Sequence, residues 1–193
     1  MTLALALAPL AALLSVAGGL TVLPILGLLT AVSVVTLHHL NQDLNAARML
    51  FVAAVALAIS VIPTWKLNDY TEESRTPGTL AALSLALFLG FTVCASLPAE
   101  EAVRISSVMP VNPSAITTSL MIIFTGLAAL ALRTGIKYQF AGLLTACNGI
   151  LLAAANAPQT RAVWIVGGSI LLLVTTCLWL AQRLSLLRSD SDF

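Results

Sequence analysis

The fold is decided by three apolar stretches, which read ITTSLMIIFTGLAALAL (residues 116–132), YQFAGLLTACNGILLAAA (138–155) and AVWIVGGSILLLVTTCLWLAQRL (162–184). Each has the length, about 17 to 25 residues, that an α-helix needs to cross a hydrocarbon core. Only residues 133–137 and 156–161 separate one stretch from the next. The sequence therefore predicts three membrane helices, joined by short connections, at the C-terminal end of the chain.

The composition of the whole chain places it in the membrane class. Of its 193 residues, 59% are apolar and only 9% are charged, whereas a soluble domain usually carries about 25% charged residues. A soluble fold of this size could not bury so much apolar surface, so lipid is expected to cover it. The net charge of +1 offers no basic surface for nucleic acid. We expect an all-α integral membrane protein.

Four further apolar helices are predicted before the three that decide the fold. The first 39 residues form one almost uncharged run with Gly18–Gly19 at its middle, where a tight turn is expected. One long tilted helix and a cleaved signal peptide are the other interpretations of this run. A signal peptide begins with a cationic segment, however, and no lysine or arginine precedes Arg48. The four predicted helices are residues 3–17, 20–37, 49–63 and 79–97.

These elements give seven crossings, or six if the first run crosses only once. The chain then divides into residues 1–114, with about four helices and polar loops, and residues 115–193, with three helices and a short tail. Residues 99–108 are expected to form a short interfacial helix. We find no second domain and no convincing internal repeat.

The placement of lysine and arginine predicts the orientation, because cytoplasmic loops of membrane proteins carry an excess of both. With seven crossings, one side holds Arg48, Arg104 and Arg161. The other side holds a larger set, namely Lys66, Arg75, Arg133, Lys137, Arg183 and Arg188. The C-terminus is therefore expected in the cytoplasm of a bacterium, with the chain in the inner membrane.

No catalytic motif is present in the sequence. Nucleophile elbows, phosphate-binding loops and dinucleotide fingerprints are all missing, and Cys94, Cys147 and Cys177 lie singly in apolar runs, without the clustering that metal ligands need. The predicted crossings also hold no Asp, Glu, Lys or Arg away from their ends, although proton and ion carriers normally have such groups. We expect no catalytic residue, no metal and no cofactor, and no catalysis by the chain on its own.

A few polar and small residues inside the predicted crossings are the candidate site. Asn148 is the most deeply placed polar residue, and Thr145 and Ser169 are expected near it. Gly142 and Gly149 are suited to close contact between helices. Amide and hydroxyl groups bond across membrane helices, so we interpret the set as helix contacts, and a lining for water or an ion is the other interpretation.

A family resemblance is carried by residues 122–149, which read IIFTGLAALALRTGIKYQFAGLLTACNG. They resemble the three-helix K subunit of respiratory complex I and, more closely, component E of hydrogenase-4-type membrane complexes. The shared features are Phe124, Gly126, Leu127, Arg133, Gly142, Asn148 and Gly149, followed by a helix that ends in a basic residue, Arg183. Component E also carries extra N-terminal helices, as predicted here. The resemblance implies a K-subunit-like unit in a complex-I-like assembly, beside an antiporter-like subunit and engaged in redox-coupled proton translocation.

The chain departs from this family at its buried glutamates, which help to form a proton path. In the two family patterns the first glutamate falls at Leu144 or at Cys147, and the second falls near Gly167 or Gly168. None of these positions is acidic here. The resemblance, with this departure, implies a non-catalytic packing subunit of an energy-converting complex. A stand-alone small transporter or channel is the alternative function, and a membrane enzyme or assembly factor that uses the loops near Asp69 or Glu100 is a third.

Overall fold

The computed structural model describes residues 3–40, 46–67, 78–96, 113–157 and 159–189. All regular elements in these ranges are helices, and none is a strand. The prediction of an all-α chain is confirmed. The elements are α1 (Leu3–Gly18), η1 (Gly19–Thr21), α2 (Leu23–Leu40), α3 (Ala46–Lys66), α4 (Thr79–Ser96), α6 (Pro113–Leu132), α7 (Ile136–Ala155) and α8 (Thr160–Ser189).

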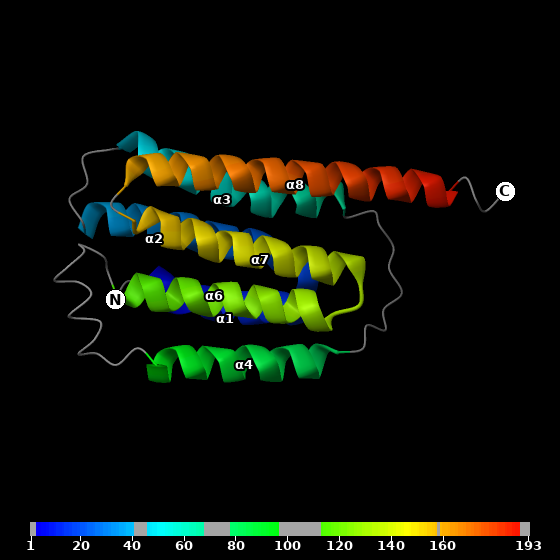
Figure 1. Ribbon diagram of the computed structural model, residues 1–193, viewed down its shortest axis with the longest axis horizontal. Coiled ribbons are helices and arrows are strands. Elements are labelled where there is room, and N and C mark those ends of the chain that lie inside the picture. The colour runs from blue at the N-terminus through cyan, green and yellow to red at the C-terminus, as the bar shows by residue number, and fades with distance from the viewer. Residues whose placement is uncertain (1–2, 41–45, 68–77, 97–112, 158, 190–193) are drawn as a thin grey trace.

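The helices have the lengths and compositions of a multi-pass membrane protein. Six of the described helices are long and apolar enough to cross a bilayer, and α2 is the shorter apolar helix. With 18 residues, α2 is about 27 Å long at about 1.5 Å per residue. Successive helices run in alternating directions along one axis, and the two termini lie at opposite ends (Figure 1). The predicted range of six to seven crossings is confirmed.

The first apolar run forms two helices, as the two glycines predict. Gly19 has a φ of +63°, a conformation that glycine adopts without strain. A side chain at this position would also meet the ring of Tyr138, because a Cβ would lie 3.0 Å from two ring carbons. The single long helix that was the other interpretation of this run is therefore excluded.

Helix α7 lies at the centre of the bundle. It contacts α1, α2, α3, α6 and α8. In its apolar stretch 67% of the residues are buried, whereas in α4 and in α8 only 22% are. Figure 1 shows α4 along one edge of the bundle and α3 with α8 along the opposite edge. Helices of residues 1–114 thus pack directly on helices of residues 115–193 in one bundle.

Several helix ends differ from the prediction. Helix α2 lies three residues later than the predicted 20–37, and α3 extends three residues beyond the predicted 49–63 at each end. Helix α6 begins at Pro113 itself and not after it, which fits the preference of proline for the first helical position. Helix α8 continues to Ser189, past the predicted end at residue 184, and projects beyond the other helices (Figure 1). The predicted interfacial helix, residues 99–108, and the acidic loop near Asp69 lie outside the described ranges.

Candidate functional site

Asn148 is the polar centre of the bundle. Its side chain is 0% exposed. The Nδ2 amide donates hydrogen bonds to Ser60 Oγ of α3 at 3.1 Å and to the Leu144 carbonyl oxygen at 3.0 Å. Its Oδ1 has no hydrogen-bond partner among the described residues. The amide therefore links α7 to α3 through a buried bond, and it keeps one acceptor unused.

A second polar contact links α7 to α1. The hydroxyl oxygens of Thr145 and Ser15 lie 2.9 Å apart, and both residues are buried. Thr145 also lies 2.8 Å from the Ala141 carbonyl oxygen, and Ser15 lies 2.7 Å from that of Ala12. Because a hydroxyl carries only one proton, one of the two donates to its own helix while the other donates across the interface.

Gly142 and Gly149 lie where α7 meets α6. A Cβ on Gly142 would lie 2.7 Å from the Leu130 backbone nitrogen and 2.8 Å from the Gly126 carbonyl oxygen. A Cβ on Gly149 would lie 2.9 Å from the backbone nitrogen of Ile123 and from the carbonyl oxygen of Ser119. Only glycine lets the two backbones approach this closely, which is the usual role of small residues between membrane helices.

Ser169 does not join this cluster, because it lies on the exposed face of α8. Over residues 160–181 of α8, the buried positions are Val163, Gly167, Ile170, Val174 and Leu178, which recur every three or four residues. Ser169 falls outside this stripe, and so do Thr175 and Thr176, whose hydroxyls donate to carbonyl groups of their own helix. The sequence places a residue on a helix, but the packing partner decides which side of the helix faces inward.

The family resemblance offers four candidate positions for its two glutamates. At three of them, packing in this structure leaves no room for a glutamate side chain. Leu144 and Cys147 are buried in the core around α7. At Gly167 the ring of Phe51 from α3 occupies the space of a side chain, because a Cβ there would lie 2.9 Å from Phe51 Cζ. Gly168 differs, since nothing lies within 4 Å of a Cβ built on it.

Introducing glutamate at position 167 tests this packing. We expect Gly167→Glu to destabilise the protein by more than about 3 kcal/mol, because the side chain overlaps Phe51 and brings an unpaired carboxyl into the apolar interior. Gly168→Glu adds the same group on the open side and is expected to cost less. Unfolding in detergent, followed by circular dichroism, compares the two variants, and equal losses would contradict the account.

Two arginines are buried at the ends of α7. From the sequence, Arg48 entered only the count of charges on each side, whereas Arg133 was also a residue shared with the resembling family. Arg48 of α3 is 8% exposed and donates hydrogen bonds to the carbonyl oxygens of Ala155 and Ala157, at the C-terminal end of α7. A cation is favoured there, because the last carbonyl groups of a helix lack intrahelical partners and carry partial negative charge. The signal that the sequence offered for this role was the position of Arg48 immediately before the start of a predicted helix.

Arg133 occupies the other end of α7. It is 2% exposed, and its guanidinium carbon lies 3.8 Å from the centroid of the Tyr138 ring, in the geometry of a cation–π contact. The same ring packs against Gly19. Arg133 and Tyr138 thereby join the turn between α1 and α2 to the connection between α6 and α7.

The arrangement can hold helices together, and it supplies no reactive group. No cluster of three or more His, Cys, Asp or Glu side chains that could hold a metal occurs in the part of the chain that the structure describes. Comparisons of the chain with protein-family models, with curated protein sequences and with solved structures found no match. The contacts described for the site are hydrogen bonds and close backbone packing between helices, centred on α7.

Proposed function

We propose that the chain is a non-catalytic membrane subunit of a complex-I-like or hydrogenase-4-like energy-converting complex, in which it packs beside an antiporter-like subunit. The carrying observation is that the buried polar groups of α7 bond to neighbouring helices, through Asn148 with Ser60 and through Thr145 with Ser15. Such contacts fix helices in place. They add no ionisable group to a crossing, and ion carriers normally need one.

The exposed face of α8 supports the proposal that a partner is present. Its large apolar side chains include Ile165, Leu172 and Trp179, which are 68%, 67% and 56% exposed. Gly168 and Ser169 lie between them on the same exposed side. Small residues allow a second membrane helix to approach closely, and we place the antiporter-like subunit against this face.

A stand-alone transporter or channel is the second candidate function. The observation in its favour is the unused Oδ1 of Asn148, a buried acceptor that could bind water or an ion. Under this alternative, Asn148 lines a path. Under the proposal, it joins α7 to α3.

Replacing Asn148 by leucine separates the two functions. We expect the variant to lose roughly 0.6 to 2 kcal/mol of stability, the range for one hydrogen bond between membrane helices, and to give less assembled complex. Ion transport per assembled complex is expected to stay unchanged. The measurements are complex yield on native gels and ion flux in vesicles normalised to that yield.

Ser84→Ala provides the matched control, because the Ser84 hydroxyl is exposed on α4, away from α8, and donates to the Ala81 carbonyl oxygen of its own helix. This variant should assemble and transport as the wild type does. A normal yield of the Asn148→Leu complex with slowed transport would instead support the path-lining function.

A further inference from the structure

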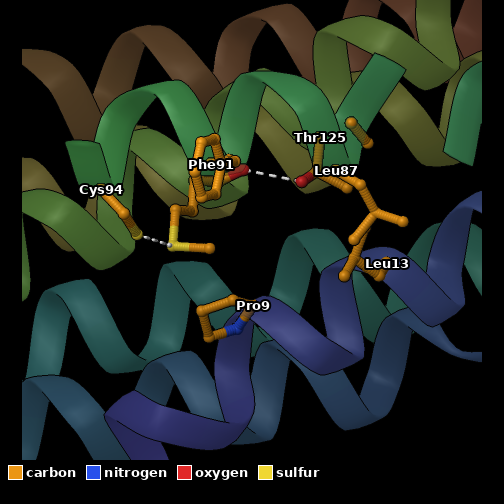
Figure 2. A pocket seen from close by; sticks show the side chains of 9 residues that line it. Pro9, Leu13, Leu87, Phe91, Cys94 and Thr125 are labelled. Atoms are coloured by element: carbon orange, nitrogen blue, oxygen red, sulfur yellow. Dashed lines mark hydrogen bonds between the residues drawn. The ribbon is translucent and has the colours of Figure 1, made fainter. Parts of the chain in front are cut away.

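An apolar groove opens between α1, α4 and α6, on the side of the bundle away from α8. Its volume is about 230 Å³. Pro9 and Leu13 of α1 face Leu87, Phe91 and Cys94 of α4 across it (Figure 2). Ala86, Gly90, Met121 and Thr125 complete the lining.

The polar side chains of the lining, Thr125 and Cys94, already have contacts within the protein. The Thr125 hydroxyl donates to the Met121 carbonyl oxygen at 2.7 Å, and the Cys94 thiol lies 3.9 Å from the Met121 sulfur (Figure 2). The remaining lining side chains are apolar or glycine. Because three helices with the length to cross a bilayer form the groove, its surroundings are hydrocarbon. Its occupant must therefore be an apolar group that is available within the membrane.

The groove runs along the helix axes. Each helix contributes residues four apart, namely Pro9 with Leu13, Leu87 with Phe91, and Met121 with Thr125, and such residues lie one above the other on a helix face. From Ala86 to Cys94 the lining extends about 12 Å along α4, at about 1.5 Å per residue.

The groove is closed at one end and has an exposed rim. Val16, Ala82 and Ala129 pack together between the same three helices, beyond the end near Leu13. Along the side of the groove, Leu87 and Phe91 are 58% and 73% exposed. The groove is therefore accessible from its side.

We propose that this groove binds one acyl chain of a membrane phospholipid, which enters through the exposed side of the groove along α4. An extended acyl chain in a bilayer runs in the direction of the groove. An apolar cavity of roughly 150 Å³ takes up a benzene-sized molecule, so the volume here holds a segment of alkyl chain. A partner helix, about 10 to 12 Å wide with its side chains, is too wide for it.

The test uses the purified full-length protein, stripped of lipid in detergent and titrated with palmitoyl-oleoyl-phosphatidylethanolamine. Native mass spectrometry counts the bound lipids. We expect one lipid to bind the wild type at least tenfold more tightly than any further lipid. Gly90→Leu fills the groove, because a Cβ at Gly90 meets only the mobile end of Met121, at 3.3 Å, and this variant should lose the tight site.

Ala95→Leu is the matched control, since Ala95 is exposed on the same helix outside the lining, and it should keep the tight site. Phe91→Ala removes part of the exposed rim and should weaken binding severalfold without disturbing the core. Equal lipid binding by the wild type, Gly90→Leu and Phe91→Ala would overturn the proposal. So would the absence of a tight lipid on the wild type, or the loss of the site in Ala95→Leu as well.

Discussion

Gly142→Ala is expected to destabilise the protein by about 1 to 3 kcal/mol, the usual cost of overpacking a filled interface. Gly142→Leu is expected to abolish recovery of folded protein. The atoms that a new Cβ would meet belong to the backbone of α6, at Leu130 and Gly126, and backbone cannot rotate away as the end of a side chain can. The two central helices would have to separate. Unfolding of the purified protein in detergent, followed by circular dichroism, measures the loss.

Gly168→Ala is the control for helix propensity. Gly168 is in the same type of helix, but no atom lies within 4 Å of a Cβ built there. Alanine favours a helix over glycine by up to about 1 kcal/mol, so this variant should be as stable as the wild type or more stable. If Gly142→Ala were equally harmless, the close packing of α6 on α7 would not hold.

Arg48→Ala is expected to destabilise the protein by about 2 to 3 kcal/mol, because it leaves two carbonyl groups at the end of α7 without their charged donor. The guanidinium reaches both Ala155 and Ala157. Arg48→Lys keeps the charge but loses the forked donor geometry, so an intermediate loss is expected. Thermal unfolding in detergent measures both variants.

Arg161→Ala is the matched control, since Arg161 carries the same charge but is exposed at the start of α8. Exposed substitutions usually change stability by no more than about 0.5 kcal/mol. If the two alanine variants lost the same stability, the effect would come from surface charge and not from the buried bonds of Arg48.

The helices could be predicted from sequence because lipid exposure makes their apolar runs nearly continuous. The pair Gly18–Gly19 even gave the position of the first turn, where Gly19 adopts a positive φ. The length of α8 was underestimated, because the prediction ended at the last strongly apolar residues. A helix can continue past the bilayer surface when polar and apolar residues mix, as they do from Gln182 to Ser189.

The candidate site was harder to predict, because it depends on which helices meet. Asn148 was singled out as a polar residue at depth, but its partner, Ser60, lies 88 positions away in the chain. In the sequence, Ser169 looked like a further polar residue of the same site, but it lies on the exposed face of α8. Nothing in the sequence marked Phe51 as a packing partner of α8, although its ring fills the space beside Gly167. Such pairings follow from tertiary packing, which a single sequence does not contain.

Purification of the tagged chain from its native membrane in mild detergent, with every co-eluting protein identified by mass spectrometry, tests the proposed function most directly. The bundle has edges at α4 and α8, where only 22% of the residues in each apolar stretch are buried. Its interior polar contacts, Asn148 with Ser60 and Thr145 with Ser15, join helices to one another. We predict that antiporter-like and redox subunits co-elute with the chain in a fixed ratio. Recovery of the chain alone, or only as its own oligomer, would contradict the proposal.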